Sequence, residues 1–261
     1  FILLLAKPGY SWQEKRQERL TLDLMICFDV SGSMEATDFA PNRLESAKGV
    51  VSEFIERMSG NRMGLILFSG FAFTQSPLTF DSELLRVMLS EAETGMVRIG
   101  GTAIGDALGV AINRLEKSGR SKERVIVLLT DGESNKGAPP KRVAEIAAKE
   151  NIRIYTVGMG TIEGHVFTQK DIFGITHKSV SKLNEKLLTE VARSTGGVYF
   201  RGNDEKGLKD AYRRIERLEK KKVATVTKKV FYPKYRLLTL LLFFLMIFDL
   251  LILNYRELLR L

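Results

Sequence analysis

Cysteine and histidine are scarce in this chain of 261 residues, which contains one cysteine and two histidines. The single cysteine, Cys27, excludes an internal disulfide, and its place inside an apolar run predicts a small buried side chain. The shortage of both residue types argues against a structural zinc site, which is built mostly from cysteine and histidine ligands. It argues equally against a catalytic triad or dyad that depends on histidine or cysteine.

The rest of the composition is typical of a folded protein, with 44% hydrophobic and 27% charged residues. This length suffices for one sizeable α/β domain with a full hydrophobic core and some appendages. The net charge of +9 is uneven, because basic residues crowd the stretch 213–236. We interpret that stretch as a collar on a membrane surface or, for 213–222, as a solvated helix end. Since it carries no aromatic interleaving and no nucleic-acid motif, we expect no nucleic-acid partner.

Both ends of the chain resemble membrane segments. A C-terminal run reads LLTLLLFFLMIFDLLIL and is apolar on every face. With Tyr235 and Tyr255 as interfacial anchors, it predicts a transmembrane helix over 237–255. Its one acid, Asp249, is expected at the interface, with a contact to a partner helix as the alternative. The opening residues FILLLAKPG predict, over 1–6, the end of another membrane helix that this numbering truncates.

Between these ends, short apolar runs rich in β-branched residues alternate with helical periodicity. The alternation predicts a doubly wound, mostly parallel α/β sheet flanked by helices, with ligand sites at the carboxyl ends of strands near a topological switch point. Within it, Pro77 should end an edge strand, and 161–183 should form a surface excursion or hairpin. The expected strands cover 20–30, 62–69, the part of 71–79 before Pro77, 124–130, 152–160 and 197–201. The expected helices cover 41–59, 81–93, 102–118, 139–150, 184–194 and 204–218.

The predicted organisation places one α/β domain between membrane segments. Its parts are the truncated helix end 1–6, a linker 7–19, the domain 20–218, a basic juxtamembrane linker 219–236, the transmembrane helix 237–255 and a tail 256–261.

The first predicted strand ends abruptly in DVSGSM, which places Asp29, Ser31 and Ser33 at alternate positions. Alternate residues at the end of a strand can turn three oxygen-bearing side chains toward one point. Hard oxygen ligands that converge in this way are typical of a small divalent cation. Taken alone, the triplet fits helix capping or a turn equally well.

Two further motifs complete an oxygen-only ligand set. GGTAIGDAL puts Thr102 at a helix start behind two glycines that let the loop approach closely, and LLTDGESN ends another strand in Thr130 and Asp131. Such a set suits Mg²⁺, with Mn²⁺ or Ca²⁺ as alternatives. The glycine-rich loop lacks the Gly-Lys-Ser/Thr of a nucleotide-binding P-loop. Three nearby acids are interpreted as ordinary loop or helix residues: Asp38, Asp106 and Glu133.

DVSGSM, GGTAIGDAL and LLTDGESN, in this order, resemble the metal-ion-dependent adhesion site of von Willebrand factor type A domains. The resemblance implies a Rossmann-like fold and a partner protein that offers an acidic residue to the ion. It also implies the metal residues Asp29, Ser31, Ser33, Thr102 and Asp131, the last acting through water.

A second resemblance covers nearly the whole chain. DFAPNRLESAK, FAFTQSPLTFD, VSKLNEKLLTEVARSTGGVYF and the C-terminal apolar run are similar to bacterial BatA/BatB-type aerotolerance proteins. This implies a bacterial inner-membrane protein linked to oxidative-stress tolerance, with a periplasmic domain and with sibling Bat proteins or a MoxR-type ATPase system as partners. The basic residues are denser before the C-terminal run than after it, where only Arg256 and Arg260 remain, and by the positive-inside rule this favours a cytoplasmic domain instead.

From these observations we expect a binding module and not an enzyme. The domain would be anchored in a membrane, hold a divalent cation and recruit a protein partner through an acidic residue. One alternative is a structural membrane scaffold whose metal site only orders loops. Another is a metal-dependent phosphoryl hydrolase, since Mg²⁺ and aspartate often serve phosphoryl chemistry, although the sequence offers it no positioned base, nucleotide loop or second metal cluster.

Overall fold

The structure is a computed structural model that describes residues 9–14, 22–97, 99–119, 123–170, 176–222, 228–233 and 235–258. The chain divides into two compact units. The larger unit is Leu20–Val223, and the smaller combines Phe1–Arg19 with Ala224–Leu261.

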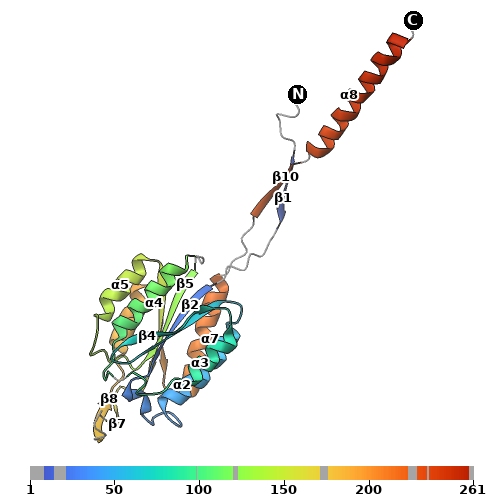
Figure 1. The fold of residues 1–261 in the computed structure, drawn as a ribbon. Coiled ribbons are helices and arrows are strands. Elements are labelled where there is room, and N and C mark those ends of the chain that lie inside the picture. Colours follow the sequence, from blue (N-terminus) through green and yellow to red (C-terminus); the bar gives the residue numbers. More distant parts are fainter. Residues whose placement is uncertain are drawn as a thin grey trace. The chain divides into compact units, whose positions relative to one another are not determined.

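A six-stranded sheet in the order β4-β3-β2-β5-β6-β9 forms the centre of the larger unit (Figure 1). Neighbouring strands pair in parallel except β3 and β4, which are antiparallel. The predicted mostly parallel α/β sheet is therefore confirmed. The strands are β2 (Leu22–Asp29), β3 (Arg62–Phe68), β4 (Ala72–Thr79), β5 (Glu123–Thr130), β6 (Ile152–Met159) and β9 (Tyr199–Gly202).

The strand order reverses at β2, which pairs with β3 on one side and with β5 on the other. The connections from β2 to β3 and from β4 to β5 therefore run in opposite directions along the sheet. A crevice at the carboxyl ends of the strands opens at such a switch point. The ends of β2 and β5, which carry the predicted site residues, are neighbours there.

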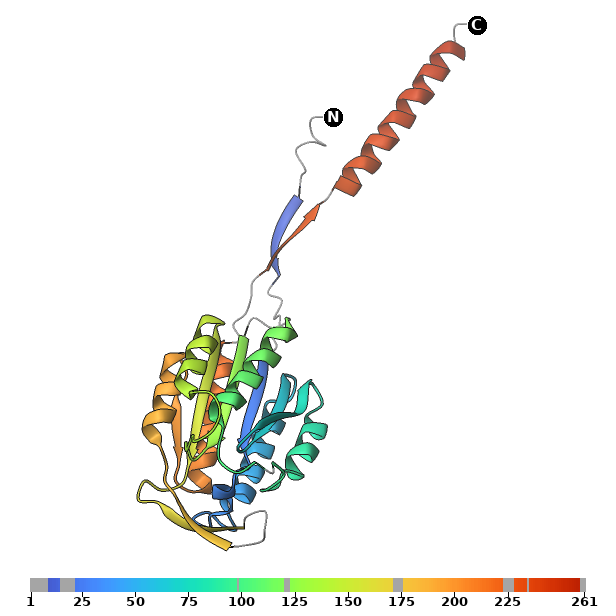
Figure 2. The same cartoon turned by 60° about the vertical axis from the view of Figure 1, so that its left-hand side comes forward.

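Helices cover both faces of the sheet, as Figures 1 and 2 show. One face carries α2 (Arg43–Arg57), α3 (Ser82–Ser90) and α7 (Glu205–Lys222), and the other carries α4 (Ile104–Ser118), α5 (Pro140–Lys149) and α6 (Glu185–Ser194).

Strand β2 contributes to both hydrophobic layers because its side chains alternate between the faces. Leu24, Ile26 and Phe28 lie in the cluster with α2, α3 and α7, and Met25 and Cys27 lie in the cluster with α4, α5 and α6. Both faces of the strand are thus buried, which explains its nearly continuous apolar sequence. The prediction of a buried, unpaired cysteine is also confirmed.

The edge strand β4 corrects one detail of the prediction. It continues through Pro77 to Thr79 instead of ending at the proline. The register with β3 shifts between the pairs Met63–Thr79 and Leu65–Ser76, so Pro77 lies at an irregular position of the ladder. An edge strand with such an irregularity tolerates proline, because no neighbouring strand needs the missing amide.

The predicted excursion over 161–183 contains an antiparallel hairpin of β7 (His165–Lys170) and β8 (Thr176–Ser181). The hairpin contacts the short 3-10 helix η1 (Gly32–Glu35), which follows β2. It therefore lies at the carboxyl end of the sheet, where Figures 1 and 2 place it within the larger unit.

The smaller unit holds an element that the sequence did not suggest. Strand β1 (Gly9–Glu14) pairs antiparallel with β10 (Lys228–Pro233), so the segments predicted as linkers, 7–19 and 219–236, each contribute a strand. Helix α7 also extends beyond the predicted domain end to Lys222. Two short strands that are far apart in sequence leave no local signature of their pairing.

Helix α8 (Tyr235–Leu258) covers the predicted transmembrane segment 237–255. Among the residues whose side chains the structure describes, no helix is long and apolar enough to cross a membrane. The structure therefore does not confirm the predicted transmembrane helix. Part of that segment (237–239, 241, 242 and 254) lies outside those side chains, and the predicted helix end 1–6 lies outside the described residues altogether.

Candidate metal centre

The predicted triplet lies at the switch point. Asp29 is the last residue of β2, and Ser31 and Ser33 follow it in the turn into η1. Their exposed fractions are only 0%, 4% and 5%. Asp29 Oδ1 accepts a hydrogen bond of 2.9 Å from the Ser31 amide, and the hydroxyl oxygens of Ser31 and Ser33 lie 3.1 Å apart. The alternate positions therefore do bring these oxygen-bearing side chains together.

The end of β5 supplies the second carboxylate. Thr130 donates a hydrogen bond of 2.6 Å to Asp29 Oδ2, which joins the two strand ends. Asp131 is fully buried. Its Oδ1 accepts the Glu133 amide at 3.1 Å, and its Oδ2 accepts the Ser181 hydroxyl at 2.8 Å. Protein donors thus engage both carboxylate oxygens of Asp131, as they do those of Asp29.

The third loop carries Thr102, which is 3% exposed and lies before α4 instead of inside it. Its amide donates to Asn135 Oδ1 at 2.9 Å, and its carbonyl accepts the amides of Asn135 and Lys136 at 3.1 and 3.2 Å. The following amide, of Ala103, donates to the Ser69 carbonyl at 2.6 Å. The Thr102 loop is thus tied to the end of β3 and to the loop after β5.

A glycine permits this close approach, as the sequence predicted. Gly101 has φ +103°, a left-handed conformation that side chains other than glycine rarely adopt. A Cβ atom there would lie 2.6 Å from Asn135 Oδ1, well inside contact distance. Any larger residue would therefore push the Thr102 loop away from the loop after β5.

The electrostatics of the buried carboxylates favour a cation. Burial and the neighbouring charge of Asp131 raise the pKa of Asp29 to about 7, although hydrogen bonds from Ser31 and Thr130 oppose the shift. The pKa of Glu133 is also raised, first by burial and then by the charge of Asp131. A divalent cation at this edge would offset both the cost of burying these charges and their mutual repulsion, which together make these acids hold protons.

Sequence reasoning missed a buried arginine behind Asp131. Arg43, at the start of α2, is fully buried and forms a bidentate ion pair with Asp38, with both nitrogen–oxygen distances 2.7 Å. Its Nη1 donates to the Ser181 hydroxyl at 2.6 Å and lies 3.6 Å from Asp131 Oδ2. Gly160 leaves room for it, since a Cβ there would lie 2.7 Å from Nη2.

Two acids that the sequence left as ordinary residues have structural partners. Asp38 compensates Arg43. Asp106 Oδ1 accepts the Ala138 amide at 2.8 Å and so joins the first turn of α4 to the loop after β5. No local pattern could reveal the second of these pairs, because Asp106 and Ala138 are 32 positions apart in the sequence.

The donor set fits a hard cation. Among the described residues, no group of three or more His, Cys, Asp or Glu side chains is arranged to hold a metal ion, so the candidate centre depends on two aspartates and the surrounding hydroxyls. Oxygen donors with few carboxylates are what Mg²⁺ accepts, because it keeps several of its waters. Hydrogen bonds join Asp29, Ser31 and Ser33 and link Asp29 to Thr130, the residue before Asp131, and the backbone brings Thr102 to the same edge.

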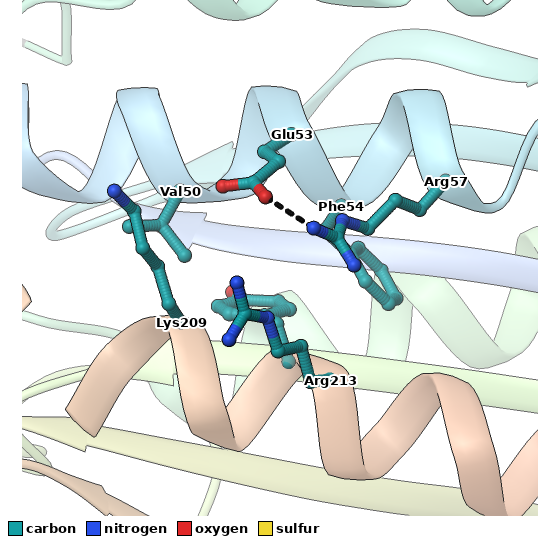
Figure 3. Close-up of a pocket in the computed structure, with 7 residues that line it drawn as sticks. Val50, Glu53, Phe54, Arg57, Lys209 and Arg213 are labelled. Atoms are coloured by element: carbon teal, nitrogen blue, oxygen red, sulfur yellow. Dashed lines mark hydrogen bonds and ion pairs between the residues drawn. The ribbon is translucent and has the colours of Figure 1, made fainter. Parts of the chain in front are cut away.

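The pocket between α2 and α7 offers no comparable site. Figure 3 shows its rim, with Glu53 and Arg57 from α2 paired to each other and Lys209 and Arg213 on α7. Its cavity volume is about 10 Å³, roughly the space that one water molecule needs. Ligand sites usually offer several hundred Å³, so this pocket is a packing feature of two helices.

Comparison with known proteins agrees with the observed fold. Residues 23–214 match the model of the von Willebrand factor type A domain. An uncharacterised protein of Borreliella burgdorferi is 30% identical over 247 residues, which cover 91% of this chain and 72% of that protein. The chain spans 65% of the length of a UPF0353 protein of Mycolicibacterium paratuberculosis, which is 26% identical over 227 residues.

Two solved structures are similar to this chain in both sequence and fold. BatB from Bacteroides thetaiotaomicron is 30% identical with a TM-score of 0.68, and an aerotolerance-related membrane protein from Bacteroides fragilis is 29% identical with a TM-score of 0.67. Each likeness covers 76% of this chain and 99% of the other. The resemblance to Bat-type proteins is thereby confirmed, and the chain belongs to the von Willebrand factor type A domain family.

Proposed function

We propose that this domain is a binding module that holds a divalent cation and uses it to recruit an acidic side chain of a protein partner. The observation that carries the proposal is the buried Asp29–Asp131 carboxylate pair at the switch point, which accepts hydrogen bonds from hydroxyls. Its neighbouring cation, Arg43, lies 3.6 Å from Asp131 and is also paired with Asp38. In this proposal the ion is held by Asp29, Ser31, Ser33 and Thr102 and, through a water, by Asp131.

Mg²⁺ is the cation that we propose, with Mn²⁺ and Ca²⁺ as alternatives. The donors are all oxygens, and few are charged, which leaves coordination positions for water or for an incoming carboxylate. When bound, the ion supplies positive charge and an open ligand position at the surface. The protein supplies orientation, since Thr130 fixes Asp29 while Ser181 and Arg43 fix Asp131.

We further propose that the chain acts at a bacterial inner membrane in a Bat-type stress-tolerance complex, with the domain on the periplasmic side. Sibling Bat proteins or a MoxR-type ATPase system are the partners that the family resemblance implies. The likeness to an aerotolerance-related membrane protein of Bacteroides fragilis supports membrane association. The proposed role is recruitment and not catalysis.

One observation favours a second candidate, a scaffold in which the ion only orders loops. Ser181 at the end of β8 joins the hairpin to Asp131, so an ion at this edge would also stiffen the hairpin. The two candidates differ in whether the partner needs the ion's open position.

A pull-down from membrane extracts with the full chain separates them. Wild type would be compared in Mg²⁺ and in EDTA with Asp29→Asn, which keeps the shape of the side chain but removes its charge. Asp81→Asn is the matched control, because Asp81 only caps α3 and asparagine caps equally well. The binding module predicts a partner retained by wild type and the control in Mg²⁺ alone. A partner retained equally in every condition would overturn it in favour of the scaffold.

A further inference from the structure

An exposed apolar pair borders the candidate metal centre. Phe71 and Ile99 are 53% and 52% exposed, and their loops meet beside the Thr102 loop. The Gly70 amide donates to the Ile99 carbonyl at 3.0 Å, and the Ser69 hydroxyl donates to the Gly101 carbonyl at 3.0 Å. A Cβ on Gly70 would lie only 2.4 Å from the Ile99 carbonyl oxygen, so this glycine is needed to bring the two loops together.

An open groove of about 710 Å³ begins at Phe71 and follows α4. It is lined along α4 from Gly105 to Lys117, and Val143 and Ile146 of α5 also line it. This stretch of helix is about 18 Å long at 1.5 Å per residue. An extended peptide of about five or six residues spans the same length.

The groove adjoins the candidate centre at one end. Gly105 and Asp106 line it, and both belong to the first turn of α4, directly after Thr102. Ala138, which donates its amide to Asp106, lines it from the loop that follows β5. A segment that reaches the candidate centre from this side therefore passes over the groove.

The middle of the groove is open to close approach. Gly109 lines it, and nothing lies within 4 Å of the position that its Cβ would take. Glycine inside a helix is less favourable than alanine, and no neighbour among the residues that the structure describes requires it here. Gly105 differs, because its Cβ would lie 1.9 Å from the Ala138 carbonyl oxygen.

The groove and the candidate metal centre differ in charge. Along the groove, Asp106 and Glu116 balance Arg114 and Lys117, so apolar contact must supply most of the affinity there. At the centre, the proposed cation attracts an acid. Lys136, whose amide bonds Thr102, is exposed and forms no ion pair with any residue that the structure describes. An acidic residue thus fits the centre, and apolar residues fit the groove.

We propose that the partner docks as an extended segment, with its acidic residue at the metal centre and bulky apolar side chains, within about five residues of the acid, in the groove along α4. The acidic end rests on the proposed function. The inference adds that the partner's residues next to its acidic residue are apolar, and that the groove along α4 binds them.

The test is a displayed library of peptides with one fixed aspartate and randomised flanks, selected on the full chain in Mg²⁺. The best peptide is then titrated against three variants. Gly109→Leu fills the groove, Phe71→Ser removes its apolar end, and Gly49→Leu is the matched control, because Gly49 is an α2 glycine that also has nothing within 4 Å of its Cβ position. Mn²⁺ affinity is measured for each variant by electron paramagnetic resonance.

We expect selected peptides rich in apolar residues near the aspartate and no binding in EDTA. Gly109→Leu and Phe71→Ser should each weaken the peptide at least tenfold, whereas Gly49→Leu should stay within twofold, and Mn²⁺ affinity should not change. Metal-dependent peptides without apolar enrichment, or equal affinity for Gly109→Leu, would overturn this inference and leave the proposed function standing. Peptides that bind equally in EDTA, or a selection without binders, would overturn both.

Discussion

Replacing Arg43 with methionine should destabilise the domain strongly. The substitution keeps an unbranched apolar stem but removes the guanidinium, which leaves the carboxylates of Asp38 and Asp131, 9% and 0% exposed, without their cation. Breaking a buried ion pair by removing one partner typically costs about 3–5 kcal/mol, because the remaining charge stays buried. For a domain of this size, that corresponds to a fall in Tm of roughly 6–20 °C.

Thermal unfolding of the full chain in EDTA, followed by circular dichroism, measures this cost without contribution from an ion. The matched control is Arg57→Met, which removes an arginine 40% exposed on the same helix, and a surface pair of that kind contributes about 1 kcal/mol or less. The double variant Arg43→Met, Asp38→Asn should recover part of the loss, since one buried charge disappears. If Arg43→Met costs no more than Arg57→Met, or if Asp38→Asn restores nothing, the buried network does not compensate these acids.

Four further predictions concern the candidate centre and α4. Because the pKa of Asp29 is raised to about 7 in the ion-free protein, protons compete with the cation, so Mn²⁺ affinity should fall as the pH drops through about 7, and a flat titration between about pH 5.5 and 8 would contradict this. By the same linkage, the ion-free protein should lose stability as the pH rises from 3.8 toward about 7, since the folded state holds the proton more tightly, and urea unfolding in EDTA checks the sign. Gly101→Ala should weaken Mn²⁺ binding, because its side chain would meet Asn135 at a positive φ, and unaltered affinity would show that the Thr102 loop need not be held. Gly109→Ala should raise the free energy of unfolding by about 0.5–1 kcal/mol, as measured by urea titration, since alanine favours the helix and meets no neighbour.

The position of Asp29 at the end of a buried strand was predictable because its signal is local to that strand. Leu24, Ile26 and Phe28 alternate with Met25 and Cys27, and the run stops at Asp29, so the sequence itself indicates a buried strand that ends in polar groups. Parallel strands of a doubly wound sheet then bring such ends to one edge.

Long-range pairing was not predictable in the same way. Arg43 looks like an ordinary charged residue in the first turn of a helix, and only the folded chain brings Ser181 and Gly160 to it. Likewise, the pairing of β1 with β10 joins the two ends of the chain and depends on no local motif. Pro77 misled the prediction because proline is excluded only where a neighbouring strand needs its amide.

The most direct test of the central claim is a Mn²⁺ and Mg²⁺ titration of the full chain, for wild type, Asp29→Asn and the α3 cap control Asp81→Asn. Loss of a residue that hydrogen-bonds to a metal ligand typically lowers metal affinity about 10–100-fold, and loss of a charged ligand should cost more. We predict one ion per chain for wild type and the control, and an affinity at least about a hundredfold weaker for Asp29→Asn. Equal affinities for all three proteins, or no binding by wild type, would contradict the assignment of a metal centre to this edge of the sheet.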